Sequence, residues 1–435
     1  MKPKRVMVDM SATIIHPGHI RLIQNASKHG QIIIGLTTDE QIISCKGYEP
    51  ELSFDQRKEV LEGIKGVGEV VPTPWLITEE VLDQYGIDLL VHGHDNSNPI
   101  SKDRLLVLPR TEGISSTEIR SRALRSMTSI NNKKLMLTPG PAVVLQENLA
   151  AIKPVFGRGD DEYQTMFDKV ISWIKEKSGQ DEVVTAQGSA TFALELAAHS
   201  FVSGKVLLVS TGYYSDRLAN LLPDNCELTI CNYEDLPSVQ GDFDWVLCAY
   251  TETSKAFKVD LSLVREKANQ LSAKLYVDST GSIGLEDNHD LCDVTAFSSC
   301  KGLFGLTGAS FVAYKSALKP RNTSQFYFNL MTHQDKKVTG PYHAIASLYG
   351  VMDIHDELKK RVINSKNSVL EKFSSFINCQ DNQPLLCTYL NGKVFPQDDS
   401  IVLYSPRSEL PGSVVCHFGE LHQEQVDIVK RIRVE

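Results

Sequence analysis

Apolar runs alternate with amphipathic stretches over the first quarter of the chain. Residues 4–9 and 31–37 are short and apolar, and residues 18–29 between them carry apolar side chains at helical spacing. Further apolar runs lie at 88–91 and 105–108. Strands that alternate with helices predict a parallel sheet. Ligands of such a sheet collect at the carboxyl ends of its strands, so functional residues are expected there.

The alternation returns after a polar segment without periodicity at 126–134. Five more strands are predicted, at 205–210, 245–250, 274–278, 294–298 and 309–314. The residues after 350 predict a mixed α/β cap with helices near 355–377 and 422–432.

A chain of 435 residues is too long for one core and suits two α/β domains. We place the first at 1–126, a linker at 127–134 and the second at 135–435. The second domain is expected to divide into a large part at about 150–320 and a small part at about 321–435.

Composition excludes several classes of protein. A content of 42% hydrophobic and 23% charged residues is typical of soluble globular proteins. The net charge of −9 disfavours a nucleic-acid partner, and no run approaches the roughly 20 apolar residues of a membrane span. The nine cysteines are scattered, without a CxxC pair or metal-ligand spacing, which suits reduced thiols in the cytoplasm. We therefore expect a cytoplasmic protein without protein ligands for a metal.

The first chemical motif is His16-Pro17-Gly18-His19, which follows the first strand and opens a helix. Histidines three residues apart share a helix face. Gly18 permits close approach of a phosphate, and the N–H groups of a helix start bind one. The imidazoles would donate to oxygens that gain charge as pyrophosphate leaves a triphosphate.

A second phosphate-binding helix start is predicted at residues 114–120. Ser115 or Ser116 would cap this helix, and its hydroxyl and N–H groups would face phosphates. Lys46 and Arg110 would supply further positive charge. The HxGH pattern alone occurs often by chance, but its combination with 114–120 indicates a nucleotidyltransferase.

Residues 4–124 resemble the cytidylyltransferases of the glycerol-3-phosphate type, a Rossmann-like HxGH family. The resemblance lies in HPGHIRL, GLTTDE, LSFDQRKEVLEGIKGV, VHGHD and LPRTEGISSTEIR. It implies transfer of CMP from CTP to a phosphate or phosphonate oxygen, with Mg²⁺. By motif, the implied catalytic residues are His16, His19, Lys46 and Arg110. The implied nucleotide-binding residues are Ser11, Ala12, His16, His19, Lys46, Asp95, Arg110, Thr111, Ser115, Ser116 and Thr117.

One departure from this family concerns the acceptor. Met10-Ser11-Ala12-Thr13 replaces the usual Gly-Thr-Phe-Asp before the HxGH motif. This variant is similar to cytidylyltransferase domains attached to phosphoenolpyruvate mutases of phosphonate pathways. The similarity favours a phosphonate over glycerol phosphate.

The second half has the parts of a pyridoxal phosphate (PLP) site. Such a site needs a lysine, an acid for the pyridine nitrogen and a phosphate cup. Residues 187–191 precede a predicted helix at 192–199 and suit the cup. Asp278 ends an apolar strand, where an unpaired carboxylate would be costly. Lys301 follows the next strand and precedes a glycine-rich loop.

Residues 135 to about 432 resemble the class V (fold type I) aminotransferases, and among them the 2-aminoethylphosphonate:pyruvate transaminases. The resemblance lies in LMLTPGPA, QGSATFALE, TGYYSDR, YTETS, LYVDSTGSIG, FSSCKGLFG, VTGPYHA and FGELHQEQVDIVKRI. It implies PLP held through Lys301, a ring stacked near Tyr214 and a homodimer in which Thr339 reaches the partner's cofactor phosphate. The implied cofactor-binding residues are Ser189, Ala190, Thr191, Tyr214, Thr253, Asp278, Ser298, Ser299, Lys301 and Thr339.

This half also departs from its family. An arginine that clamps the amino acid carboxylate usually stands in a Phe-Arg-Ile-Gly context, but residues 413–419 contain none. Arg407 and Arg217 are candidates to replace it; otherwise the amino donor differs from alanine.

Together the halves suggest two consecutive steps. Phosphonoacetaldehyde would be aminated to 2-aminoethylphosphonate, with an amino acid as donor, and the product coupled to CTP to give CMP-2-aminoethylphosphonate and pyrophosphate. Three alternatives stay open. The same chemistry could convert dihydroxyacetone phosphate to CDP-serinol, the N-terminal domain could be vestigial, or one domain could only tether or regulate the other.

Overall fold

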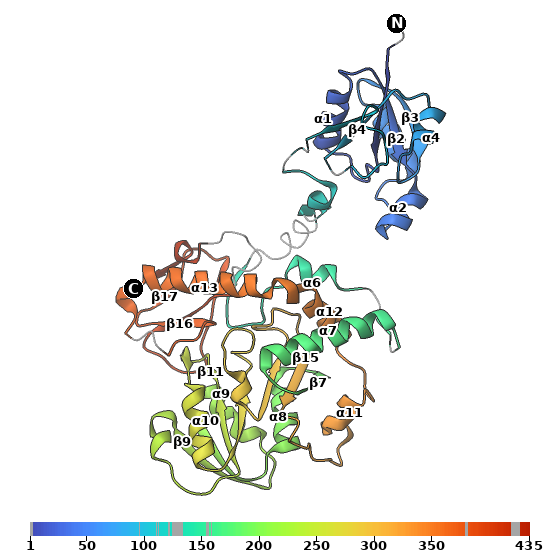
Figure 1. Cartoon of the computed structure of the whole chain (residues 1–435). Helices are drawn as coiled ribbons and strands as arrows, with labels where there is room; N and C mark the ends of the chain where they lie inside the picture. Colours follow the sequence, from blue (N-terminus) through green and yellow to red (C-terminus); the bar gives the residue numbers. More distant parts are fainter. Residues whose placement is uncertain are drawn as a thin grey trace. The chain divides into compact units, whose positions relative to one another are not determined.

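The computed structural model describes residues 3–94, 96–109, 111, 113–120, 122–123, 134–153, 156–157, 159–378, 382–418 and 427–435. The chain divides into two compact units, Met1–Asn131 and Asn132–Glu435, here called the N-terminal unit and the C-terminal unit (Figure 1). Apart from Lys134, the linker expected at 127–134 lies outside the described residues.

The N-terminal unit is built on a five-stranded parallel sheet with the order β3-β2-β1-β4-β5. The strands are β1 (Arg5–Met10), β2 (Gln31–Thr37), β3 (Val67–Thr73), β4 (Leu89–Gly93) and β5 (Leu105–Leu108). The helices between them include α1 (Pro17–Ala26), α2 (Asp39–Lys46), α3 (Phe54–Glu62) and α4 (Glu79–Gln84). The predicted parallel α/β sheet is confirmed. Its strand order reverses between β1 and β4, which is where sheets of this kind bind ligands.

Both faces of this sheet are covered. Val6 and Val8 of β1 belong to one apolar cluster and Met7 to another, and all three are fully buried. Burial on both faces explains why these strands are continuous apolar runs without alternation.

The C-terminal unit contains a seven-stranded sheet with the order β7-β15-β14-β13-β10-β8-β9, in which only β15 runs antiparallel to its neighbours. Its strands are β7 (Glu182–Gln187), β8 (Gly204–Ser210), β9 (Cys226–Asn232), β10 (Trp245–Ala249), β13 (Lys274–Asp278), β14 (Val294–Ser298) and β15 (Ala309–Tyr314). Helices of this unit include α7 (Asp161–Ser178), α8 (Ala190–Phe201), α10 (Leu261–Gln270) and α12 (Tyr342–Val351). The five strands predicted here are all present.

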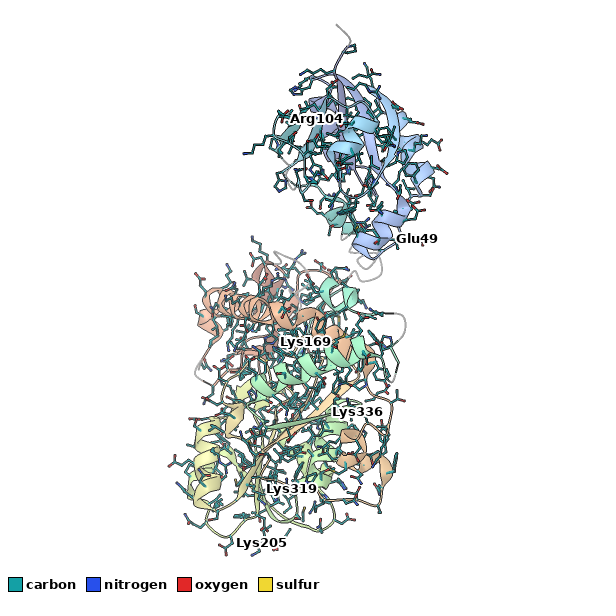
Figure 2. The ribbon with its side chains drawn as sticks, turned by 45° about the vertical axis from the view of Figure 1, so that its right-hand side comes forward. Glu49, Arg104, Lys169, Lys205, Lys319 and Lys336 are labelled. Atoms are coloured by element: carbon teal, nitrogen blue, oxygen red, sulfur yellow. The ribbon has the colours of Figure 1, made fainter. Side chains whose placement is uncertain are left out.

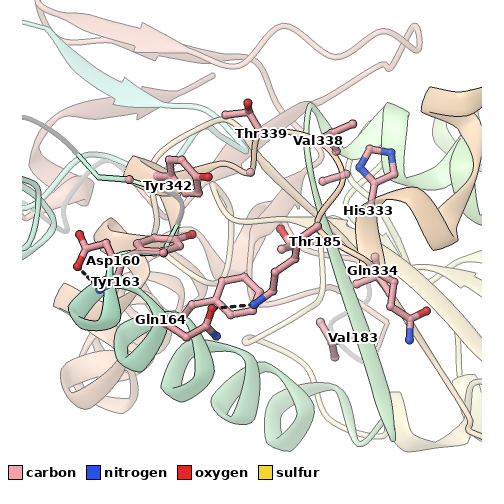
Figure 3. A pocket seen from close by; sticks show the side chains of 17 residues that line it. Asp160, Tyr163, Gln164, Val183, Thr185, His333, Gln334, Val338, Thr339 and Tyr342 are labelled. Atoms are coloured by element: carbon pink, nitrogen blue, oxygen red, sulfur yellow. Dashed lines mark hydrogen bonds between the residues drawn. The ribbon is translucent and has the colours of Figure 1, made fainter.

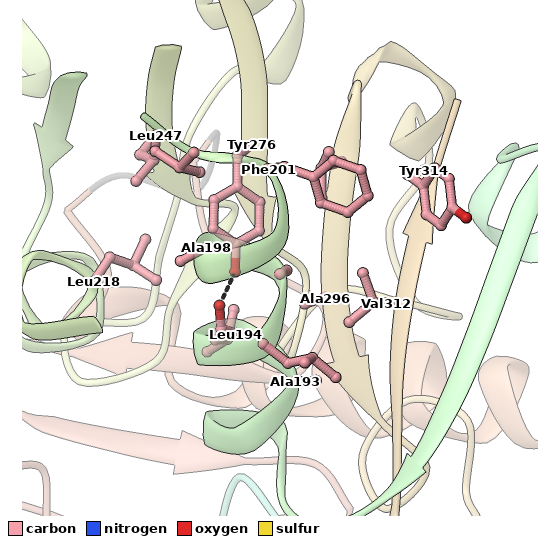
Figure 4. Packing of buried hydrophobic residues seen from close by; sticks show 14 of the residues in the cluster. Ala193, Leu194, Ala198, Phe201, Leu218, Leu247, Tyr276, Ala296, Val312 and Tyr314 are labelled. Carbon is pink, nitrogen blue, oxygen red and sulfur yellow. Dashed lines mark hydrogen bonds between the residues drawn. The ribbon is translucent and has the colours of Figure 1, made fainter. Parts of the chain in front are cut away.

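Helix α8 is fixed to the middle of this sheet by one buried tyrosine. The hydroxyl of Tyr276 on β13 donates to the carbonyl of Leu194 on α8 at 2.8 Å (Figure 4). Tyr276 is buried, so this bond leaves no unpaired hydroxyl in the apolar core. It connects the strand that ends at Asp278 to the helix that begins after Ser189.

The remaining elements form a smaller layer around α13 (His355–Lys372). Three strand pairs belong to it: β16 (Cys387–Leu390) with β19 (Ser413–Cys416), β17 (Val394–Pro396) with β20 (Ile432–Val434), and β6 (Leu135–Leu137) with β18 (Ile401–Leu403). The helix expected at 355–377 is present as α13 and a short 3-10 turn, Ser374–Phe376.

The prediction of a helix at 422–432 is wrong for the part that the structure describes. Ile428–Lys430 is a 3-10 turn, and β20 begins at Ile432. Ile428 and Ile432 are both buried, and the β-branched residues of this segment favour pairing with β17 over a helix.

Charged side chains project from the outside of each unit, as at Glu49 in the N-terminal unit and Lys205 in the C-terminal unit (Figure 2). Over the part of the chain that the structure describes, none of the helices combines the length and the apolar character needed to cross a membrane.

Candidate functional site

His16 and His19 form a reciprocal cap at the start of α1. The Nδ1 atom of His16 accepts the N–H of Gly18 at 3.1 Å, and the Nδ1 atom of His19 accepts the N–H of His16 at 3.3 Å. The two ring centroids are 4.0 Å apart. A neutral ring that accepts at Nδ1 carries its proton on Nε2. The cap therefore gives both imidazoles the tautomer that donates from Nε2.

The electrostatics of His19 agree with this tautomer. Burial, followed by the nearby charges of His16 and Lys46, lowers the pKa of His19 to about 4. The ring is therefore neutral near pH 7. A neutral donor suits stabilisation of phosphate oxygens better than proton transfer.

Lys46 reaches the same region from the end of α2. Its Nζ donates to the Ser11 hydroxyl at 2.9 Å and lies 5.3 Å from the centre of the Trp75 ring. Ala12 is buried next to Ser11 and has a positive φ of 41°, a conformation uncommon for residues with a side chain. Trp75 was not predicted as a site residue.

A cavity of about 270 Å³ opens beside these residues at the carboxyl ends of β1 and β4. The predicted residues in its wall are Ser11, His16, His19, Thr111 and Ser115. Ser116 turns its hydroxyl to the Ile14 carbonyl at 3.3 Å, and Thr117 is exposed. The wall of the cavity does not include Ser116, Thr117, Lys46 or Ala12. Arg110 and Asp95 lie outside the described residues.

The cavity also contains residues that the sequence did not single out. Asp9 and His92 line it, with 3.6 Å between Asp9 Oδ2 and His92 Nε2. The same carboxylate accepts the side-chain amide of Asn98 at 3.1 Å. The feature of the sequence that could have revealed this residue is that Asp9 interrupts an apolar strand.

The segment that departs from the family is held by Arg120. Its guanidinium donates to the Thr13 hydroxyl at 2.8 Å and pairs with Glu51. Thr13 of this segment is therefore attached to the helical segment that carries Arg120.

In the C-terminal unit, Arg217 connects Asp278 to the Tyr214 ring, which Lys301 approaches. Asp278 is 4% exposed, accepts the N–H of Thr280 at 2.8 Å and lies 3.5 Å from the Arg217 guanidinium. Lys301 Nζ is 5.8 Å, and the Arg217 guanidinium carbon 5.3 Å, from the centre of the Tyr214 ring. The lysine and the acid are thus linked through Tyr214 and Arg217.

The LMLTPGPA segment packs against this lysine. A Cβ atom built on Gly140 would lie 3.0 Å from Lys301 Cγ, and the φ of Gly140 is +137°. The Ala142 N–H also donates to the Cys300 carbonyl at 2.6 Å. A side chain at this position would crowd Lys301, and the positive φ favours glycine.

The predicted phosphate cup lies at the start of α8. Ser189 is the N-cap residue but makes no side-chain cap bond, so the first N–H groups of this 12-residue helix have no cap from it. Thr191 accepts from Arg217 at 3.3 Å, and Ala190 is the first helical residue. A phosphate suits this helix start.

The two serines before Lys301 differ in their surroundings. The Ser299 hydroxyl donates to the carbonyls of Leu306 and Ala309, whereas Ser298 contacts the Cys300 sulfur at 3.6 Å. Ser298 is therefore the better phosphate ligand of the pair. Thr253 is buried between β11 (Thr251–Glu252) and β12 (Phe257–Lys258).

Buried polar atoms without a partner among the described residues also lie near Asp278 in the sequence or the structure. They include Arg217 Nε, Thr251 Oγ1 and Thr280 Oγ1. Buried polar groups in proteins are nearly always hydrogen-bonded, so these atoms call for a polar ligand or water. The residues fit PLP: Asp278 would pair with the pyridine nitrogen, and the start of α8 would bind the phosphate.

Glu252 is a site residue that the sequence did not reveal. It is fully buried and accepts the N–H groups of Tyr214 at 2.9 Å and Ser215 at 3.1 Å. Burial raises its pKa. The carboxylate holds the start of α9 (Tyr213–Arg217) and with it the Tyr214 ring. The sequence shows an acid inside YTETS, but it does not show which backbone N–H groups the carboxylate binds.

Thr339 lies in a different place. It lines a pocket of about 200 Å³ together with Tyr163, Thr185 and His333 (Figure 3). None of the predicted cofactor residues near Lys301 lines this pocket. Its predicted role requires a second copy of the chain and stays a prediction.

Comparisons with known proteins divide the chain in the same way. The family described as Cytidylyltransferase-like matches residues 11–122. The glycerol-3-phosphate cytidylyltransferase of Staphylococcus aureus is 37% identical over 125 residues, which cover 27% of this chain and 92% of that protein.

The C-terminal unit matches other proteins. The 2-aminoethylphosphonate–pyruvate transaminase of Pseudomonas aeruginosa is 24% identical over 308 residues, covering 60% of this chain and 82% of that protein. The crystal structure of an aspartate aminotransferase from Thermus thermophilus superposes with a TM-score of 0.58 at 16% identity, covering 67% of this chain and 95% of that one. The C-terminal unit has an aminotransferase fold and is similar to 2-aminoethylphosphonate–pyruvate transaminase. Through its N-terminal unit, the chain belongs to the cytidylyltransferase family.

Proposed function

We propose that this chain makes 2-aminoethylphosphonate in its C-terminal unit and activates it with CTP in its N-terminal unit. The observation that carries the proposal is the presence of both sets of residues in one chain: the capped pair His16 and His19, and the group of Lys301, Asp278 and Tyr214. The product of the second unit would be the acceptor for the first. This pairing favours a phosphonate over other acceptors.

In the N-terminal unit, a phosphonate oxygen would attack the α-phosphorus of CTP. The new P–O bond replaces the bond to the bridging oxygen, and pyrophosphate leaves with the electron pair. His16 and His19 donate from Nε2 to the oxygens that gain charge, and Lys46 adds a positive charge near Ser11. Among the described residues no three His, Cys, Asp or Glu side chains are arranged to hold a metal, so the triphosphate would provide most ligands of a Mg²⁺ ion.

In the C-terminal unit, PLP would supply an electron sink when bound. Lys301 would hold the cofactor and move a proton to and from the carbon that carries the amino group. Asp278 would keep the pyridine nitrogen protonated, Tyr214 would stack on the ring, and Ser189, Thr191 and Ser298 would bind the phosphate. Thr253 would approach the phenolic oxygen, and Thr339 would serve the second site of a homodimer.

Phosphorus NMR tests the proposal directly. The purified protein is incubated with CTP, Mg²⁺ and 2-aminoethylphosphonate, and in parallel with glycerol 3-phosphate and ethanolamine phosphate. We expect pyrophosphate and a mixed phosphonate–phosphate anhydride signal with 2-aminoethylphosphonate, and much slower conversion of the two phosphate esters. Faster conversion of a phosphate ester would overturn the phosphonate assignment.

A further inference from the structure

The expected carboxylate arginine has no replacement on its own strand. Within the described part of 413–419, the candidate cation is His417, which is fully buried. Its ring contacts the hydroxyls of Ser365 at 3.2 Å and Thr388 at 2.9 Å. Burial lowers the pKa of His417 to about 3, so it is neutral near pH 7. This strand offers no charge to a substrate anion.

Arg217 is occupied elsewhere. Its guanidinium lies 3.5 Å from the Asp278 carboxylate and donates to the Thr191 hydroxyl at 3.3 Å. Its charge therefore balances the buried Asp278. Withdrawing it to bind a substrate would leave that carboxylate with less compensation.

Residues 404–408, here called the 404–408 loop, bring another arginine to the same ring system. The guanidinium of Arg407 is exposed, donates to the Tyr213 hydroxyl at 2.6 Å and lies 5.0 Å from the centre of its ring. The Tyr213 and Tyr214 rings are 5.2 Å apart, and the Tyr214 ring contacts Lys301. Arg407 thus contacts Tyr213, and the Tyr213 ring contacts the Tyr214 ring beside Lys301.

The same loop carries a buried hydroxyl. The Tyr404 oxygen lies beside the side chains of Tyr214 and Thr253 and forms no well-aligned hydrogen bond with a described residue. Burial and the neighbouring Tyr214 raise the pKa of Tyr404, which keeps its proton available for donation. The Ser408 hydroxyl donates to that of Ser254 at 3.0 Å, which ties the loop to the segment carrying Thr253.

We propose that the 404–408 loop is the subsite for the anionic group of the transaminase substrates, with Arg407 pairing to the anion and the Tyr404 hydroxyl donating to it. The inference rests on the proposed function of the C-terminal unit. A guanidinium has five N–H donors in a planar fork that matches carboxylates and phosphonates, so its bond to Tyr213 leaves donors for a ligand. The donor and the acceptor substrate would use one subsite in turn, since each carries an anion close to its reacting carbon.

Single-turnover spectroscopy of the holoenzyme tests this assignment. The decay of visible absorption of PLP bound to the protein is followed with alanine, with 2-aminoethylphosphonate and with ethylamine, which lacks an anion. We expect Arg407→Ala to lower the second-order rate constant for the anionic amines by roughly 10- to 100-fold and to leave that for ethylamine unchanged. Arg407→Lys should recover part of the loss, and Tyr404→Phe should reproduce a smaller loss of about 10-fold.

The control is Arg433→Ala. Arg433 is also an arginine over an aromatic ring, 5.3 Å from the centre of Phe395, but lies on β20 and contacts none of the residues around Lys301 that are described. Binding of unreactive methylphosphonate and acetate to the holoenzyme, measured by calorimetry, separates affinity from chemistry. Arg407→Ala should weaken the binding of both anions.

The outcomes distinguish failure of the proposed subsite from failure of the proposed function. Loss on both alanine and 2-aminoethylphosphonate supports the shared subsite, whereas loss on only one of them overturns its use by both substrates. An equal loss on ethylamine, or no loss on any amine, overturns it. If the wild-type protein binds no PLP or reacts with no amine, the proposed function fails instead.

Discussion

At the scale of single residues, both sites depend on polar groups whose protonation is set by their neighbours. His19 is kept neutral by burial and by its cap. The Glu252 carboxylate accepts hydrogen bonds from the backbone that carries Tyr214. Neither side chain needs to exchange a proton with a substrate to be indispensable. Their role is to fix which atoms donate and where a ring lies.

The lowered pKa of His19 predicts the pH dependence of cytidylyl transfer. Because the folded-state pKa is about 4, the ring takes up a proton only as the pH falls through that value, well below the ordinary 6.5. We expect no loss of activity from this residue between about pH 8 and pH 5. The measurement is kcat against pH, with an NMR titration of the imidazole signals. A ring signal that titrates near pH 6.5 in the wild type and is missing from His19→Gln would contradict the lowered pKa.

Single residues also show how far sequence reasoning reaches. The placement of His16, His19, Asp278 and Lys301 was predictable because each lies at the end of an apolar run or at the start of a helix, a local pattern that any sheet of this kind preserves. Glu252 and Asp9 were not singled out, because groups they bind lie far away in the chain. Tyr404 was not, because nothing near it in the sequence shows that its loop approaches Tyr214. The choice between Arg217 and Arg407 depended on which of them meets Asp278.

At the scale of elements, the N-terminal site is held by a residue that does not line the cavity beside His16 and His19. Arg57 of α3 is fully buried and donates to the carbonyls of Thr37 at 3.0 Å, Leu52 at 3.1 Å and Ser11. It also pairs with Asp39 at the start of α2, the helix that ends in Lys46. One side chain therefore sets the spacing between the Ser11 segment and the helix that presents the lysine.

Replacing Arg57 should disturb the N-terminal unit alone. We expect Arg57→Met to destabilise this unit by about 3 kcal/mol, because several buried carbonyls and Asp39 lose their donor. Cytidylyl transfer should fall and transamination should persist. Urea unfolding and both activities are measured beside Lys58→Ala, whose side chain on the same helix is exposed. An Arg57→Met protein as stable as Lys58→Ala would refute the positioning role.

Elements were predicted unevenly. Central strands such as β13 and β14 were placed to the residue, because burial on both faces leaves an uninterrupted apolar run. The described part of the helix predicted at 422–432 was misjudged, because its apolar spacing fits a helix and the partner of β20, β17, lies more than thirty residues earlier. Pairing at that separation leaves no trace in a local pattern.

At the scale of the whole molecule, the chain has two units whose chemistries share no residue. His16→Ala should lower cytidylyl transfer by about 100-fold or more, since it removes a donor to the developing charge, and leave transamination intact. Lys301→Ala should abolish transamination and leave cytidylyl transfer intact. Each activity is assayed separately with its own added substrates. Equal loss of both activities in either variant would contradict the independence of the units.

The pairing of β6 with β18 has a practical consequence for anyone who wishes to separate the halves. Leu135–Leu137 is the first strand of its unit, yet its neighbour is Ile401–Leu403, and the loop that follows it presses Gly140 against Lys301. A cleavage site placed after this strand would detach it from the loop in which Gly140 packs against Lys301. Proteolytic or genetic cuts should therefore fall upstream of Leu135.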